Sequence, residues 1–373
     1  MEHHDSRLHL NALCALAVVL IGSLACIDTS SQGQGDEWEV GEDEPPVADE
    51  GPVEVEEQEE WVWVPFPTSK CGNGQPTGVG VNLTDRSSDV VFFLQGGGAC
   101  WDTNTCFVVN SAVNINTGYG ELRFEAEPAR GIGPFDREDP ENPFKDASYV
   151  FVPYCTGDLF SGNNVQSYEV LGTQREVHHV GAANMQLYLD RFSETFTGER
   201  KILLMGSSAG GYGAQLSYHA FADAFPEAEL HVLSDSGPMV QPLQRRWNAM
   251  AASWDPQTPE DCELCAFGLP QWSDYLVSNH PESRFGLLAY DADTVVSLYF
   301  AYPLNDDLFA EAVARLIEDT YDPAEHAAAY VLEGNQHVML GDFTSVESPS
   351  GDRLVDWVRA WANGEDGWQN VTP

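Results

Sequence analysis

The chain has 373 residues, enough to bury a large core in one large domain or two small ones. Its 17 Lys and Arg residues against 59 Asp and Glu residues give a formal net charge of −42, while its hydrophobic content is ordinary for a globular protein. Nucleic acid and anionic membrane surfaces would repel such a chain, so we exclude nucleic acid as a partner.

The N-terminus is typical of an export signal over residues 1–25. The apolar run 10–26 is short for a membrane span and ends in small residues. Ser23 and Ala25 suit ordinary signal cleavage before Cys26, and a cysteine there also suits a lipoprotein. Lipidation of Cys26 would leave an even six cysteines after cleavage, and paired cysteines are typical of exported proteins. We expect a secreted, periplasmic or cell-surface protein, attached to a membrane only if Cys26 carries a lipid.

Residues 26–60 form the next segment, which is rich in Asp and Glu, has no Lys or Arg, and contains scattered Gly, Pro and Ser. Such a composition cannot bury enough apolar surface to offset the entropy lost on ordering. It predicts a disordered acidic tether, with the globular domain covering 61–373.

Short apolar runs then alternate with helical patterns. The runs are flanked by turn residues, as expected of parallel strands covered on both faces. They lie at 90–95, 147–153, 201–206, 229–235, 285–291 and 328–334. Strands alternating with helices predict an α/β fold with a doubly wound, mostly parallel sheet.

Amphipathic spacing predicts the main helices. One follows the second strand and is expected to include His178 and His179; a second covers 212–225, and the last ends at Gly364. Two segments, 102–146 and 238–284, interrupt the alternation. Long insertions of this kind are usually binding loops or lids, and the tryptophans and cysteines in the second argue against disorder.

The segment "KILLMGSSAGGYGA" (201–214) places two serines between a strand and a helix. A serine at such a turn projects its hydroxyl above the sheet only if the backbone is strained and the residues two before and two after it are small. Ser208 has Gly206 and Gly210 at those positions, whereas Ser207 would have the bulky Met205. The sequence predicts Ser208 as a nucleophile, with a plain glycine-rich turn as the alternative.

A serine nucleophile needs a base and an acid that orients it. In this fold class the acid follows a later strand and the histidine follows the last one. Asp291 ends the run 285–291 and His337 follows the run 328–334, so we predict these two residues. Asp235, at the end of an earlier strand, is the main rival acid, and Asp293 is a weaker one.

Three glycines follow the first apolar run, in "FFLQGGGACWD" (92–102). Glycines let backbone N–H groups point inward without obstruction, as the oxyanion loops of esterases do. We predict oxyanion donors at Gly97, Gly98 and Ala209. A phosphate-binding loop is the alternative, but the segment lacks the Lys and Ser/Thr of a Walker loop and the glycine spacing of a dinucleotide fingerprint.

Taken together, the chain resembles the pectin acetylesterase/Notum family of secreted carboxylesterases. The resemblance covers roughly 62–362, and its motifs are "FFLQGGGACWD", "YVFVPYCTGDLFSG", "GSSAGGYGA", "AYDAD" and "NQHVML". It implies an α/β-hydrolase fold, a Ser208–Asp291–His337 triad and an oxyanion hole at Gly97, Gly98 and Ala209. Family members often have Trp where Gly98 stands here, so the family's acyl pocket does not carry over directly.

The remaining cysteines fit an exported scaffold. Cys100 and Cys106 are close enough to clip the loop after the first predicted strand, and Cys71 with Cys155 would tie the start of the domain to a strand end. Cys262 and Cys265 pair with each other, or else form half of a C-x-x-C zinc site that would need further ligands. We expect no metal and no cofactor.

We therefore expect a secreted serine carboxylesterase that hydrolyses acetyl or other short-chain O-acyl esters of a small molecule or carbohydrate through an acyl-enzyme. An acyltransferase on the same triad is one alternative. A non-catalytic surface binding protein on a hydrolase scaffold is another, which the intact serine, acid and histidine set argues against.

Overall fold

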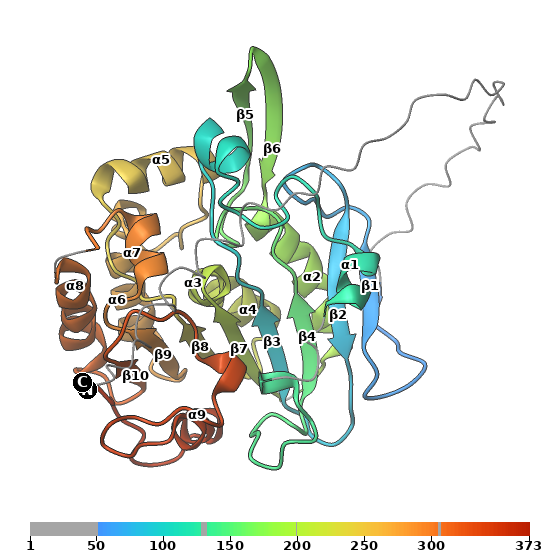
Figure 1. Cartoon of the computed structure of the whole chain (residues 1–373). Helices are drawn as coiled ribbons and strands as arrows, with labels where there is room; N and C mark the ends of the chain where they lie inside the picture. The colour runs from blue at the N-terminus through green and yellow to red at the C-terminus, as the bar shows by residue number, and fades with distance from the viewer. Residues whose placement is uncertain (1–50, 128–132, 199, 305–306) are drawn as a thin grey trace, which may run out of the picture. The chain divides into compact units, whose positions relative to one another are not determined.

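A computed structural model of the chain describes residues 51–127, 133–198, 200–304 and 307–373 (Figure 1). The predicted signal 1–25, Cys26 and most of the predicted tether lie outside these residues. No helix within the described ranges is both long and apolar enough to cross a membrane.

The core is an eight-stranded sheet. The first two strands are antiparallel to their neighbours and the others are parallel, which is an α/β-hydrolase-like arrangement. In sheet order the strands are β1 (Val62–Phe66), β2 (Thr77–Asn82), β4 (Ser148–Val152), β3 (Val90–Leu94), β7 (Lys201–Ser207), β8 (Glu229–Asp235), β9 (Phe285–Tyr290) and β10 (Ala327–Leu332). The six strands predicted from apolar runs are all present, and β1 and β2 were not predicted.

Side chains of the parallel strands pack alternately into two hydrophobic clusters, one on each face of the sheet. Ile202 and Leu204 of β7 belong to the cluster that also contains residues of α2 to α8. Leu203 and Met205 belong to the cluster that contains the tryptophans of α9. Burial on both faces is the reason that these strands are uniformly apolar in sequence.

The helices include the three regions that the sequence predicted. The segment 212–225 forms two helices, α3 and α4, which meet at Ser217. The bounds are α1 (Glu121–Ala126), α2 (Gly181–Thr195), α3 (Ala209–Leu216), α4 (Tyr218–Ala224), α5 (Gln244–Trp254), α6 (Leu269–Asn279), α7 (Thr294–Phe300), α8 (Leu308–Leu316) and α9 (Leu354–Asn363).

One prediction about the region before α2 is wrong. His178 and His179 lie in a two-stranded hairpin of β5 (Asn164–Val170) and β6 (Thr173–His179), not in a helix. The hairpin projects from the rest of the domain beside α5 (Figure 1). Its strands are mostly exposed and polar, so they lack the apolar run that identified the core strands.

The predicted domain start at residue 61 is also too late. The side chain of Val53 is buried, and its N–H donates to Thr195 Oγ1 at 2.8 Å. Glu59 forms an ion pair with Arg86. The described end of the acidic segment, 51–60, is therefore held against the domain, because it contains an apolar anchor as well as its charges.

The insertion 102–146 connects β3 to β4, and 238–284 connects β8 to β9. Three disulfides link the cysteine pairs that the sequence suggested. They are Cys71–Cys155, Cys100–Cys106 and Cys262–Cys265.

Candidate active site

Ser208 occupies the turn between β7 and α3 with φ 57° and ψ −120°. This backbone conformation is strained for a residue with a side chain. A Cβ atom on Gly206 would lie 2.2 Å from the carbonyl oxygen of Gly210, and one on Gly210 would lie 1.9 Å from that of Leu94. The close approach that the G-x-S-x-G spacing predicted is therefore present, and it requires glycine at both positions.

The two adjacent serines have different environments. Ser207 donates its hydroxyl hydrogen bond to Asp235 Oδ2 at 2.8 Å. Ser208 instead lines a cavity of about 20 Å³. Only the second hydroxyl is thus placed to meet a ligand.

The walls of this cavity are almost entirely apolar. Helix α7 contributes one side, α5 contributes Met250, and the loop after β4 contributes Leu159. The lining residues are Gly98, Ala99, Leu159, Ser208, Ala209, Tyr212, Met250, Val295, Val296, Tyr299 and Phe300. The cavity is therefore small, and its walls favour an apolar group.

The glycine loop after β3 lies against the same cavity. Gly97 and Gly98 have φ of 156° and 74°, and a Cβ atom on Gly98 would lie 2.2 Å from the Tyr299 hydroxyl. Within the described residues, the N–H groups of Gly97, Gly98 and Ala209 donate to no protein acceptor. Unpaired amide donors are rare where the backbone is shielded from water, and Ala209 is 2 % exposed.

The histidine predicted from the last strand has an acidic partner, but not the predicted one. His337 Nδ1 lies 2.6 Å from Asp293 Oδ2, whereas the Asp291 carboxylate accepts a hydrogen bond from the Gly334 N–H at 2.9 Å. The structure therefore pairs His337 with Asp293 and not with Asp291. Because a carboxylate accepts, Nδ1 carries the proton, which leaves Nε2 free to act as a base.

Asp293 also caps a helix, and the capping hydrogen bonds hold its side chain in place. It is the N-cap of α7, and its Oδ1 accepts hydrogen bonds from the N–H groups of Val295 at 2.8 Å and Val296 at 3.1 Å. The side chain is almost fully buried. One oxygen is thus fixed by the helix while the other faces the imidazole.

Asp291 forms hydrogen bonds between two loops and does not bond the histidine. Its backbone N–H donates to the Leu332 carbonyl, and its carboxylate binds Gly334 in the following loop. It therefore joins the loop after β9 to the loop after β10. The sequence signal for Asp293 was its N-cap position, an Asp directly before the apolar helix "TVVSLYF".

Two neighbouring backbone contacts bring the serine and histidine segments together. The Ser208 N–H donates to the Asp235 carbonyl at 2.7 Å, and the Val338 N–H donates to Ser236 Oγ at 2.8 Å. Among the described residues, no hydrogen bond joins the Ser208 hydroxyl directly to His337. Such bonds are often long in ligand-free enzymes and tighten when the substrate binds.

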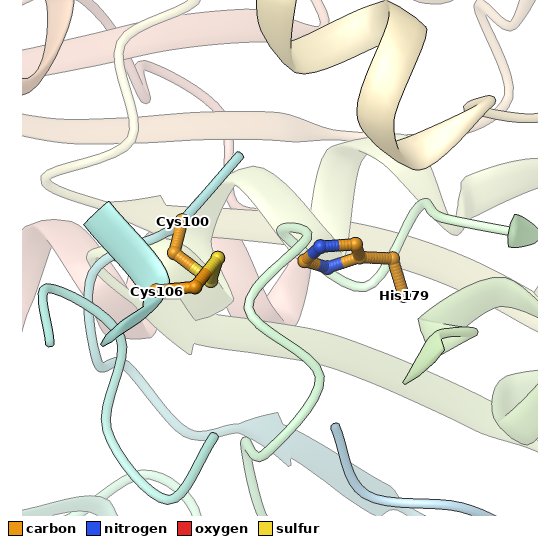
Figure 2. Close-up of side chains that lie close together, drawn as sticks. All are labelled: Cys100, Cys106 and His179. Carbon is orange, nitrogen blue, oxygen red and sulfur yellow. A yellow bond between two sulfur atoms is a disulfide. The ribbon is translucent and has the colours of Figure 1, made fainter. Parts of the chain in front are cut away.

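The structure also brings together three side chains whose atoms could bind a metal ion. They are Cys100, Cys106 and His179 (Figure 2). Both sulfurs are joined in a disulfide. The His179 ring contacts the Thr156 carbonyl through Nδ1 at 2.8 Å and the Tyr168 hydroxyl through Nε2 at 3.0 Å. The potential ligand atoms are therefore all engaged, the two sulfurs with each other and the His179 ring in joining the hairpin to the loop after β4.

Comparison with known proteins finds similarity between about half of the chain and known esterases. The pectinacetylesterase family profile matches residues 68–253. Palmitoleoyl-protein carboxylesterase NOTUM of Homo sapiens is 28% identical over 183 residues, which cover 47% of this chain and 35% of that protein. Palmitoleoyl-protein carboxylesterase notum2 of Xenopus laevis is 27% identical over 219 residues, covering 56% of this chain and 42% of that protein.

The matched region therefore spans well under half the length of these relatives. The family profile includes Gly97, Gly98 and Ser208, whereas Asp293 and His337 lie C-terminal to it. The matched range therefore covers the Ser208 turn and the glycine loop but not the segments that carry the acid and the histidine.

Proposed function

The chain belongs to the pectin acetylesterase/Notum family of carboxylesterases, and from that premise we propose that it is a serine esterase that hydrolyses short O-acyl esters. The observation that carries this proposal is the strained Ser208, whose side chain lines an apolar cavity beside unpaired backbone donors. We assign the base to His337 and the orienting acid to Asp293.

The reaction follows from these positions. His337 Nε2 takes the proton of Ser208 Oγ as the oxygen bonds to the ester carbonyl carbon, and the negative oxygen that forms is stabilised by the amides of Gly97, Gly98 and Ala209. His337 then protonates the leaving alcohol as the ester C–O bond breaks. A water molecule, deprotonated by His337, then attacks the acyl carbon. The bond from that carbon to Ser208 Oγ breaks, His337 returns the proton to Oγ, and the carboxylic acid leaves.

Asp293 acts in both half-reactions through its hydrogen bond to His337. Its carboxylate fixes the tautomer that presents Nε2 to the serine, and its charge stabilises the imidazolium formed in each half-reaction. The N-cap bonds to Val295 and Val296 keep the carboxylate oriented.

The size of the cavity supports a short acyl group. About 20 Å³ suits an acetyl methyl or a slightly larger group. The names of the similar NOTUM proteins specify a palmitoleoyl chain. A chain of that length exceeds a cavity of this volume, so we propose acetyl or similarly short esters of a small molecule or carbohydrate.

Labelling with a fluorophosphonate probe tests the assignment directly. The wild-type protein should react at one serine, and Ser208→Ala should not react and should lose p-nitrophenyl acetate hydrolysis by about 10⁶-fold. A panel of p-nitrophenyl esters from acetyl to palmitoyl should show highest kcat/KM at the short end. Labelling that persists in Ser208→Ala, or a preference for palmitoyl esters, would contradict the proposal.

We also propose that the protein works outside the cytoplasm. Its three disulfides would be reduced in a cytosol, and stable pairs of this kind are typical of oxidising compartments. Mass spectrometry of the mature N-terminus would test cleavage and lipidation at Cys26.

A further inference from the structure

We propose that Asp235, which is not the partner of the histidine, is a positioning residue that holds the Ser208 turn and the His337 loop in register. The inference rests on the proposed function, because it assigns these two segments to one reaction. It concerns a residue that sequence reasoning considered only as a rival acid.

Asp235 contacts the serine turn through its backbone and its side chain. Its carbonyl accepts the Ser208 N–H at 2.7 Å, and its Oδ2 accepts the hydroxyl of Ser207 at 2.8 Å. The conformation of the nucleophile turn is therefore tied to the end of β8 at two adjacent residues.

The same carboxylate holds the loop that carries the histidine. Oδ1 accepts the Met339 N–H at 2.9 Å, and Oδ2 accepts the Leu340 N–H at 3.1 Å. The next residue, Ser236, accepts the Val338 N–H at 2.8 Å. The three backbone N–H groups directly after His337 are thus bound by Asp235 and Ser236. These pairs are separated by 102 to 105 residues in sequence.

The backbone is strained at three residues near Asp235. Ser208, Ser236 and Val338 have φ of 57°, 56° and 60°. A positive φ is a genuine outlier for a β-branched residue such as valine. Strained residues of this kind persist only where their surroundings hold them firmly. Asp235 bonds Ser208, precedes Ser236 in the chain, and bonds Met339, the residue directly after Val338.

The environment of the Asp235 carboxyl fits a fixed positioning group. The side chain is fully buried, and burial raises its pKa, whereas the hydrogen bonds from Leu340, Ser207 and Met339 and the proximity of His337 act in the opposite direction. Three donors converge on the two oxygens. Loss of these donors would leave a buried carboxylate without hydrogen bonds, which would destabilise the folded protein. The carboxylate therefore holds the serine turn and the histidine loop together.

The roles of the two acids are therefore separate. Asp293 bonds the imidazole itself, and Asp235 bonds the backbone that carries it. Removal of the Asp235 contacts should shift the imidazole relative to the hydroxyl without changing the cavity where the acyl group binds.

The test compares Asp235→Asn and Ser236→Ala with a control, Asn184→Ala. Asparagine has nearly the same size as aspartate, but its NH₂ group cannot accept the Leu340 and Ser207 hydrogen bonds. Ser236→Ala removes only the Val338 contact and remains available if Asp235→Asn fails to fold. Asn184 is also a buried polar residue with two long-range hydrogen bonds, to the backbone of Lys70, and neither lies in the site.

In Asp235→Asn we expect kcat for p-nitrophenyl acetate to fall about 100-fold with KM within twofold of wild type, because a misplacement of about 1 Å has an effect of that size. Ser236→Ala should show the same pattern to a smaller degree. Asn184→Ala should lower the unfolding midpoint and leave kcat unchanged. Hydrogen exchange at Met339 and Leu340 should be faster in Asp235→Asn only.

An unchanged kcat and unchanged exchange in Asp235→Asn would overturn the inference, as would a rise in KM with kcat intact. If the wild-type protein neither hydrolyses esters nor reacts with a fluorophosphonate, the proposed function fails. Exchange at Met339 and Leu340 then still decides whether Asp235 holds the loop.

Discussion

His337 Nδ1 donates a hydrogen bond to Asp293 Oδ2 at 2.6 Å, while the other oxygen of the same carboxylate caps helix α7. Helix α7 also supplies Tyr299 and Phe300 to the cavity beside Ser208. The carboxylate that bonds His337 and two residues that line the cavity therefore lie at the start and end of one helix, so their positions are coupled.

This relationship predicts a large difference between two neighbouring acids. Asp293→Asn should lower kcat about 10⁴-fold, because the amide presents the wrong partner to Nδ1–H and stabilises the wrong tautomer. The measurement is steady-state hydrolysis of p-nitrophenyl acetate, with circular dichroism to verify folding.

Asp291→Asn is the matched control. Asparagine keeps the Oδ1 acceptor for the Gly334 N–H, so the joined loops should remain and kcat should stay within a few-fold of wild type. A greater loss in Asp291→Asn than in Asp293→Asn would restore Asp291 as the acid and refute the assignment drawn from the geometry.

Local chemistry was enough to predict part of this site. Gly206 and Gly210 identified Ser208 because the contact between them is set by adjacent residues, and the glycine loop after β3 was identified for a similar reason. The parallel core strands were equally clear, because burial on both faces makes them continuously apolar.

The sequence predicted Asp291 as the partner of His337, two positions before the residue that bonds it, because strand ends alone were used to locate the partner. Asp291 and Asp293 both follow β9, and only the folded loop decides which one faces His337. The cavity residues come from five separate segments, and their meeting depends on how α5 and α7 pack. No spacing along the chain encodes that contact.

Tyr299 should limit the length of the acyl group. Its ring lines the cavity, and its hydroxyl is bonded to the Ser111 carbonyl. Tyr299→Ala should raise kcat/KM for butyrate relative to acetate by about 10-fold or more, since each methylene accommodated in an apolar pocket is worth roughly 1–3 kcal/mol. Tyr299→Phe keeps the ring and should preserve the preference for acetate; an unchanged ester profile in both variants would show that another residue sets the limit.

The disulfides should contribute unequally to stability. Cys71–Cys155 closes a loop of 84 residues and Cys262–Cys265 one of 3. Chain-entropy arguments give about 4–5 kcal/mol for the long loop and about 2 kcal/mol for the short one. Urea unfolding of the two double Cys→Ser variants should reproduce that order, and equal losses would mean that native packing around the sulfurs outweighs loop closure.

His179 should make the stability of the protein depend on pH. Burial lowers its pKa from 6.5 to about 4, and its two ring nitrogens are hydrogen-bonded in the neutral form. Between these two pH values the unfolded chain binds a proton that the folded chain excludes, so this stabilisation is complete above pH 6.5 and is lost as the pH falls toward 4.

The loss should amount to about 3 kcal/mol over that interval. His179→Gln removes the titrating ring, so its deficit in unfolding free energy relative to wild type should be greatest near pH 7 and shrink toward pH 4 in urea titrations. His178→Gln, at the neighbouring and partly exposed position, should keep the wild-type dependence. A constant deficit in His179→Gln at every pH would mean that the folded protein protonates this ring as readily as the unfolded chain does.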